Sequence, residues 1–175
     1  MHTLACDRHV LLLHATHLTQ RSRTAGRHGN ARADRPVARG MYADTETVRR
    51  ILTETGDTWA VVGLSGNRQR AAYGVAEVLQ RFGKRVVPVH PRAESVHGEK
   101  GYAELSEIPF PVDVVDVFVN SQLAGAVADE AVEIGARAVW FQLGVIDEAA
   151  WERTRAGGLD MVMDRCPAIE IPKLG

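Results

Sequence analysis

Cysteine is scarce in this sequence of 175 residues, and long apolar runs are missing from it. The two cysteines, Cys6 and Cys166, lie in regions of different character and form no C-x-x-C pair. This argues against a disulfide framework or a structural zinc site and fits a reducing cytoplasm. No apolar run reaches the roughly 18 residues that a membrane span requires. The run VLLLHATHL at 10–18 is interrupted by histidine and does not resemble a signal peptide. We therefore expect a cytoplasmic protein without a membrane partner.

An excess of basic charge is also missing from residues 41–175, which hold 14 basic and 20 acidic side chains. That balance gives no electrostatic footprint for nucleic acid. Residues 1–40 differ, with seven arginines and two aspartates, and large apolar residues are rare from 19 to 40. We expect 1–40 to be a disordered extension. It is either a nucleic-acid arm, an arginine-rich targeting peptide or, as we favour, a non-functional extension before a true start at Met41.

The motifs of common catalytic sites do not occur in residues 41–175. G-x-S-x-G, H-E-x-x-H, a paired-histidine metal motif and a Walker lysine are all lacking. Arg165 could lower the pKa of the Cys166 thiol, but a structural cysteine at a strand end is the better interpretation. We therefore predict no catalytic residue and no metal ligand.

From Met41 onward, apolar runs of strand length alternate with helical periods. Such Val-rich strands, separated by helices, indicate a parallel sheet that is covered on both faces. Right-handed crossovers then give an α/β, Rossmann-like, doubly wound sheet of about five strands in three layers, with the predicted order 3-2-1-4-5. The predicted strands are 59–64, 85–90, 112–119, 137–144 and 159–164.

Helix boundaries are indicated by polar caps and terminal glycines. Asp44 is expected to cap a first helix that stops at Gly56, and a second helix runs from Tyr73 to Phe82. Ser121 is expected to cap a third and Asp147 a fourth, the latter with Trp151 facing inward. The predicted buried stripe of the third helix is Leu123, Val127, Ala131 and Ile134.

The loop after the first strand has the features of an anion-binding turn. Gly63 and Gly66 allow close backbone approach, and Ser65 adds a hydroxyl. Amides entering the next helix can donate to phosphate, and Arg68 and Arg70 supply positive charge. The alternative is an ordinary turn with solvated arginines. Because the loop faces the point where the strand order reverses, we favour anion binding.

The second strand ends in His90-Pro91-Arg92, where an NAD site would place an acidic acceptor for the ribose 2′-hydroxyl. A cation at this position favours a ribose that carries its own phosphate, as in NADP or coenzyme A. A strand ended by proline and followed by a solvated arginine explains the same residues nearly as well.

The ends of the third and fourth strands add further candidates. Asn120 follows the third strand, and Gln142 and Gly144 end the fourth. The amide could bond a base or a pantetheine group, but a simple turn explains Gln142 and Gly144 equally well. Asp116 could be a buried acid, although a strand-end carboxylate bonded to backbone or to an arginine is commoner.

Three stretches carry a family resemblance: WAVVGLSGNRQRAAYGVAEVLQRFGKRVVPVHPR, GEKGYAELSEIPFPVDVVDVF and GARAVWFQLGVIDEAAWERTRAGGLDMVMDRC. They resemble the small stand-alone CoA-binding domain proteins of bacteria, which are related to the N-terminal domain of the succinyl-CoA synthetase alpha subunit. The likeness covers about 45–174.

The resemblance implies coenzyme A, or an acyl-CoA, at the carboxyl ends of the strands. Ser65, Gly66, Asn67 and Arg68 would meet its phosphates, and Arg92 stands where the synthetase has a phosphate-binding lysine. The segment Phe141, Gln142 and Leu143 matches one that contacts the cofactor. The motif SYxV of the stand-alone proteins is replaced by Ala72-Tyr73-Gly74-Val75, and we keep Tyr73 among the candidate contacts.

The leading hypothesis is a CoA-binding domain over 41–175 that performs no catalysis of its own. An NADP-dependent oxidoreductase that uses Arg92 for the 2′-phosphate is the alternative, and a ligand-free interaction module is the third. A homodimer or a partner enzyme is compatible with each of these hypotheses.

Overall fold

Five parallel strands form one sheet in the part of the chain that the computed structural model describes, Tyr42 and residues 44–175. The predictions for residues 1–40 lie outside this part. The strands are β1 (Thr58–Val62), β2 (Arg85–Val89), β3 (Val114–Val117), β4 (Ala138–Phe141) and β5 (Asp160–Val162). The helices are α1 (Thr45–Thr53), α2 (Ala71–Arg81), α3 (Ser121–Glu133), α4 (Glu148–Ala156) and α5 (Pro167–Glu170), with the 3-10 turns η1 (Leu105–Glu107) and η2 (Ile171–Lys173).

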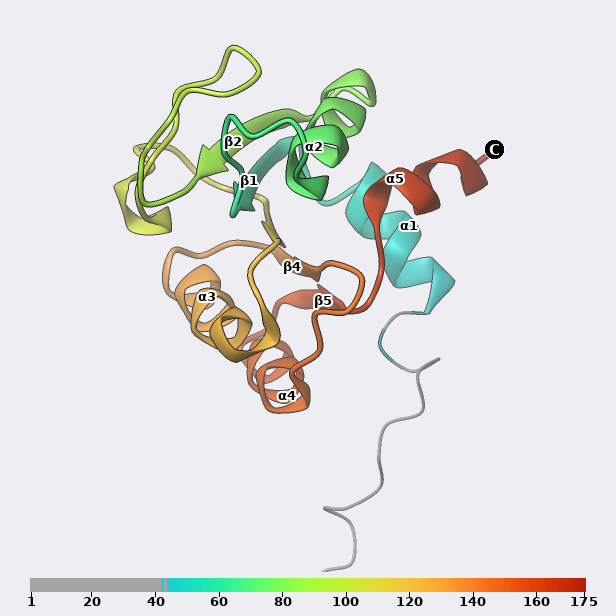
Figure 1. Cartoon of the computed structure of the whole chain (residues 1–175). Helices are drawn as coiled ribbons and strands as arrows, with labels where there is room; N and C mark the ends of the chain where they lie inside the picture. Colours follow the sequence, from blue (N-terminus) through green and yellow to red (C-terminus); the bar gives the residue numbers. More distant parts are fainter. Residues whose placement is uncertain (1–41, 43) are drawn as a thin grey trace, which may run out of the picture. The chain divides into compact units, whose positions relative to one another are not determined.

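The helices cover both faces of the sheet, so the predicted three-layer, doubly wound α/β fold is confirmed (Figure 1). One face packs against α3 and α4, and the other against α1, α2 and α5. Each strand is buried over most of its length, which explains why the strands read as continuous apolar runs. None of the described helices is both long enough and apolar enough to cross a bilayer.

The strand order is 2-1-3-4-5, and the predicted order 3-2-1-4-5 was wrong. The connection from β2 to β3 crosses over β1, and its Leu105 and Val112 are buried on the face that α3 covers. β2 is therefore an edge strand. Pro88 fits that place, because its carbonyl accepts from the Tyr102 amide on the outer side, where its own missing N–H would also point.

The helix starts follow the predicted caps with one exception. Asp44 and Asp147 cap α1 and α4 with their carboxylates. The cap of α3 is Asn120, not Ser121, because the Asn120 side chain accepts from the amides of Gln122 and Leu123. Ser121 is the first residue of the helix, and its hydroxyl instead accepts from the Ile146 amide at 3.0 Å.

The buried face of α3 was also predicted wrongly in part. The helix presents Ala124, Gly125, Ala128 and Ala131 to the core. Leu123 is 56% exposed, whereas Ala131 is buried as predicted. Small side chains allow the helix to approach its neighbours closely: a Cβ atom added at Gly125 would lie 2.5 Å from an Asp147 carboxylate oxygen. Because these small residues form the contact with the core, Leu123 lies outside that contact and faces a cavity.

Candidate functional site

A cavity of about 1000 Å³ opens at the carboxyl ends of β1, β2 and β3. It lies at the point where the strand order reverses, because α2 leaves β1 toward one face of the sheet and α3 leaves β3 toward the other. Its arginines come from two loops, and its apolar lining comes from strand ends, from η1 and from three residues of α3. The residues that line it include Gly63, Ser65, Asn67, Arg70, His90, Pro91, Arg92, Glu104, Leu105, Asn120, Leu123, Ala126, Val127 and Glu130.

The β1–α2 loop forms one wall of this cavity. Gly63 has φ +98, and a Cβ atom there would lie 3.2 Å from Phe118 Cβ, so glycine is required for the turn. Ser65 is buried beside it, and the Asn67 carboxamide accepts from the Gln69 amide. These contacts hold the chain in a tight turn that leads directly into α2.

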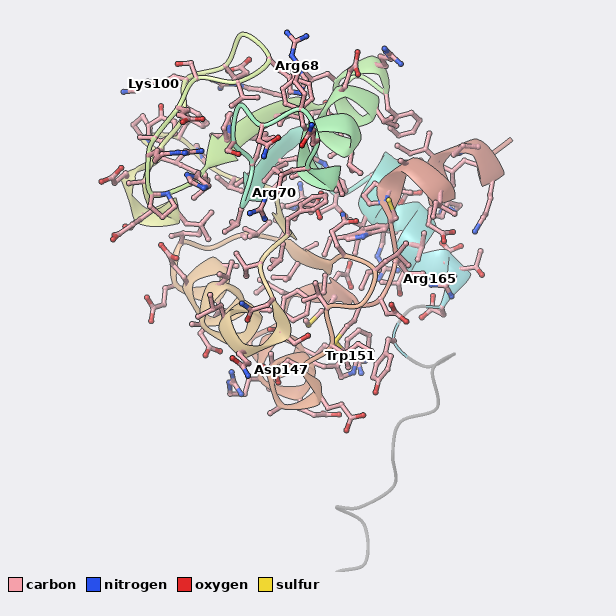
Figure 2. All side chains as sticks on the ribbon, in the orientation of Figure 1. Arg68, Arg70, Lys100, Asp147, Trp151 and Arg165 are labelled. Carbon is pink, nitrogen blue, oxygen red and sulfur yellow. The ribbon has the colours of Figure 1, made fainter. Side chains whose placement is uncertain are left out.

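The start of α2 is electrostatically positive. Arg70 is its N-cap residue, and within the described chain no side chain caps the helix and no acidic residue lies in its first turn. The helix dipole and the entering amides therefore attract an anion. Arg70 lines the cavity, whereas Arg68 does not and has its guanidinium 5.8 Å from the Tyr73 ring centroid. Figure 2 shows Arg70 beside the sheet and Arg68 at the outer side of the loop.

The segment after β2 forms the second polar wall. His90, Pro91 and Arg92 all line the cavity. The Arg92 amide donates to His90 Nδ1 at 3.2 Å, so a neutral His90 carries its proton on Nε2. Arg92 Nε lies 2.9 Å from an oxygen of Glu94, whose other oxygen accepts from the Gly66 amide at 2.9 Å. An acidic side chain, Glu94, therefore stands close to the end of β2, although none occurs in His90-Pro91-Arg92, where the sequence analysis looked for one.

The opposite wall is largely apolar, with Glu104 and Glu130 beside its apolar residues, and it was missed in the sequence. Leu123, Ala126 and Val127 of α3 face the cavity, together with Leu105 of η1. Leu123 and Val127 had been interpreted as core residues, since both fit a helical stripe; Val127 does pack, partly buried, against the core, whereas Leu123 is exposed. The signal that could have revealed them is the run of alanines at 124, 128 and 131, which defines a second and more compact stripe.

The predicted contacts at the end of β4 and just after it are not among the cavity-lining residues. Phe141 is fully buried, and Gln142 is buried with its amide nitrogen 2.7 Å from Asp116 Oδ1. Leu143 is 56% exposed, and the Gly144 amide donates to Asp164. Among the described residues, therefore, this segment is bonded within the protein, and its role toward a ligand stays a prediction.

Tyr73, Gly66 and Arg68 are three further predicted contacts outside the lining. Tyr73 packs against His97, with ring centroids 4.1 Å apart, and its carbonyl bonds His97 Nε2. The three nevertheless belong to one loop and the helix start that follows it, next to Ser65 and Arg70, which do line the cavity. The structure thus gathers the β1, β2 and β3 candidates and sets the β4 candidates apart.

Asp116 is a fully buried acid, the rarer of the two interpretations of its sequence position. Its neighbours across β1 and β4 are Val61 and Trp140. Burial raises the pKa of Asp116 to about 7, and the hydrogen bond from Gln142 opposes that rise only in part. Its Oδ2 atom has no partner among the described residues.

Cys166 is buried, and burial raises the pKa of its thiol. A thiol with a raised pKa is a poor nucleophile at neutral pH, so the interpretation as a structural cysteine is supported. Among the described residues, no group of three or more His, Cys, Asp or Glu side chains is arranged to hold a metal ion. The chemistry that the cavity offers is recognition of an anion at one wall and of an apolar group at the other.

Residues 57–172 match the protein family described as "CoA binding domain". The chain is 36% identical over 107 residues to the uncharacterized protein YneT of Bacillus subtilis, which covers 61% of this chain and 79% of YneT. A hypothetical protein from Pyrococcus horikoshii OT3 has a similar solved structure, with a TM-score of 0.71 and 35% identity over 75% of this chain and 92% of that one. The alpha subunit of ADP-forming acetate–CoA ligase II from Pyrococcus furiosus is 33% identical over 81 residues, which is 46% of this chain but only 18% of that subunit.

Proposed function

Because the chain belongs to the family of CoA-binding domains, we propose that it binds coenzyme A or an acyl-CoA in the cavity at the carboxyl ends of β1, β2 and β3. The single observation that supports this best is the division of the cavity into a cationic and an apolar wall. Coenzyme A has the same division, with phosphates at the nucleotide end and a long pantetheine arm at the other.

The phosphates are assigned to the cationic wall. Ser65, Asn67 and Arg70 face the cavity from the loop that leads into α2. Arg92 approaches from the neighbouring strand end, so the two arginines lie on two separate segments of one wall. Guanidinium groups bind phosphate through paired hydrogen bonds, and the N-terminus of α2 adds its dipole. Arg92 is the proposed partner of the 3′-phosphate on the ribose.

The pantetheine arm is assigned to the wall formed by α3 and η1. Leu123 is the residue that favours this most strongly, since a leucine that is 56% exposed at a cavity mouth has surface to bury. The volume of about 1000 Å³ lies at the upper end of the range of about 300–1,000 Å³ that small-molecule sites occupy.

The proposal covers binding alone. The ligase activity in the name of the Pyrococcus furiosus relative belongs to a protein of which the chain matches 18%. The cavity lining offers cations, amides and apolar side chains, and its one acidic pair, Glu104 and Glu130, lies at the α3 and η1 side. Glu130 accepts a hydrogen bond from the Ser106 amide there, which gives it a structural role.

Isothermal titration calorimetry with coenzyme A and dephospho-CoA tests the proposal. We expect saturable CoA binding, and a ligand concentration of 100 times the Kd should stabilise the fold by about 2.7 kcal/mol. Dephospho-CoA should bind at least several-fold more weakly, because it lacks the 3′-phosphate. No heat of binding at millimolar coenzyme A would overturn the proposal. NADPH is added in parallel, and enhanced nicotinamide fluorescence would favour the oxidoreductase instead.

A pair of arginine variants separates a specific contact from general charge. Arg92→Ala should weaken CoA binding roughly tenfold and reduce the preference over dephospho-CoA. Arg81→Ala is the matched control, since Arg81 is exposed at the far end of α2 and pairs with Glu77. Equal losses in the two variants would show that net charge, not the Arg92 position, governs the affinity.

A further inference from the structure

The carboxylate of Glu94 bonds Arg92, which belongs to the proposed phosphate site, and the amide of Gly66, which directly follows the cavity-lining Ser65. One oxygen accepts from the Gly66 amide at 2.9 Å, and the other lies 2.9 Å from Arg92 Nε. Gly66 belongs to the loop before α2, and Arg92 to the segment after β2, so the carboxylate links both parts of the cationic wall. A carboxylate and a phosphate use the same donors in the same manner, through two oxygens and negative charge.

The backbone around Glu94 is shaped so that the side chain reaches the loop. Ala93 has φ +47, a left-handed conformation that a residue with a side chain rarely adopts. Its amide donates to the His90 carbonyl at 2.7 Å, which closes a tight turn. The Glu94 carbonyl lies against Gly101, where an added Cβ atom would come within 2.1 Å of it. The main chain is thus fixed, while the Glu94 side chain is 36% exposed, so solvent reaches it on one side.

We propose that Glu94 is an internal competitor for the phosphate of the ligand, and that the site therefore selects ligands with more negative charge than a carboxylate. This inference depends on the proposed function, since it assumes that a CoA phosphate uses the same donors. A phosphate cannot take the Gly66 amide and Arg92 Nε while the carboxylate remains, because the two anions would repel each other across a few ångströms. Binding therefore releases Glu94 into solvent.

A different role for Glu94 would be to accept a ribose hydroxyl, as an acidic side chain after the second strand does in dinucleotide sites. The contacts argue against it. Both oxygens of Glu94 are engaged by donors of the cationic wall, the Gly66 amide and Arg92 Nε. To accept from a ribose hydroxyl, the carboxylate would have to give up or share these bonds.

The test is calorimetric titration of the full chain and its Glu94→Gln variant with coenzyme A. Glutamine keeps an oxygen for the Gly66 amide but loses the charge, so we expect CoA to bind the variant at least roughly fivefold more tightly. Glu99→Gln is the matched control: Glu99 lies on the same connection and faces Arg85 at 3.5 Å, outside the cavity lining. Its affinity for coenzyme A should equal that of the unaltered chain.

Two phosphate-poor ligands show whether charge causes the gain. A gain with coenzyme A but not with dephospho-CoA places Glu94 against the 3′-phosphate, and an equal gain with both places it against the diphosphate. Pantetheine, which has no phosphate, should gain nothing. A gain with pantetheine as well would mean that the substitution merely repacks the loop, and it would overturn the inference.

The remaining outcomes are separable. CoA binding that is unchanged or weaker in Glu94→Gln refutes the competitor while the proposed function stands. If neither the unaltered chain nor the variant binds coenzyme A, the proposed function itself fails. Thermal unfolding without ligand checks the fold of the variant. Should Glu94→Gln unfold early, Glu94→Ala replaces it, because removal of the side chain must also free the two donors.

Discussion

We expect Asp116 to make the free energy of unfolding fall as the pH rises toward 7. The side chain is fully buried between Val61 and Trp140, and its one side-chain partner among the described residues is Gln142. Burial raises its pKa from 3.8 to about 7. The unfolded chain therefore releases this proton at a lower pH than the folded chain does. The stability contribution of the neutral acid is present in full below pH 3.8 and is lost as the pH rises toward 7.

The size of the effect follows from that shift. A rise of about three pKa units corresponds to about 4 kcal/mol in all, at about 1.4 kcal/mol per unit. Part of it is already lost at pH 5, where the unfolded carboxyl is ionised. Between pH 5 and pH 8 we therefore expect Asp116 to lower the free energy of unfolding by about 2 to 3 kcal/mol.

The Asp116→Asn variant isolates this contribution. Its carbonyl can still accept from Gln142, and its NH₂ group replaces Oδ2, which has no partner among the described residues. The variant thus resembles the neutral acid at every pH. Urea unfolding at pH 5, 6, 7 and 8 should show it gaining on the unaltered protein by about 2 to 3 kcal/mol across the range.

The comparison cancels the other titrating groups, because they are common to both proteins. Any constant offset measures the cost of the buried amide, about 1–3 kcal/mol for an unpaired donor, and does not bear on the slope. Parallel stability curves for the two proteins would refute the reasoning, since they would mean that Asp116 has the same pKa folded and unfolded.

Three further predictions concern the cavity. Gly63→Ala should lower the free energy of unfolding by about 1–3 kcal/mol because of its φ of +98. Gly74→Ala, in an open place on α2, should raise the free energy of unfolding by about 0.5–1 kcal/mol. Urea unfolding measures both changes. Leu123→Ala should weaken CoA binding several-fold in calorimetry and change the stability by less than about 0.5 kcal/mol, since the leucine is exposed in the free protein. At low salt, Arg70→Ala should weaken CoA binding more than Arg68→Ala does, because only Arg70 lines the cavity; equal losses would contradict the assigned wall.

The five strands and four of the five described α-helices could be predicted from the sequence, because each depends on local pattern, whereas α5 and the two 3-10 turns were not predicted. Apolar runs such as 59–64 and 137–144 overlap the strands β1 and β4, with an excess of two or three residues at their carboxyl ends. The caps Asp44 and Asp147 were identified because a carboxylate before a helical period has one obvious partner. At the start of α3 two potential capping residues stand side by side, and local pattern does not decide between Asn120 and Ser121.

The position of Glu94 shows what the local pattern cannot reveal. The residue is five positions beyond the end of β2, and the sequence gives no reason to connect it with Gly66, 28 residues earlier. Their contact depends on the turn at Ala93 and on the way β1 and β2 align. Long-range contacts of this kind, which also place Leu105 and Leu123 around one cavity, follow from topology and not from periodicity.

The strand order itself accounts for which predicted contacts came together. In the order 3-2-1-4-5, the reversal lies between β1 and β4, so Gln142 and Gly144 would face the loop that begins at Gly63. In the observed order it lies between β1 and β3, and the residues after β3 take that place: Asn120 lines the cavity, while β4 stands one strand further away. Pro88 could have indicated the correct strand order, because a proline in the middle of a strand favours an edge position. With β2 at the edge, β3 must pair with β1 from the other side.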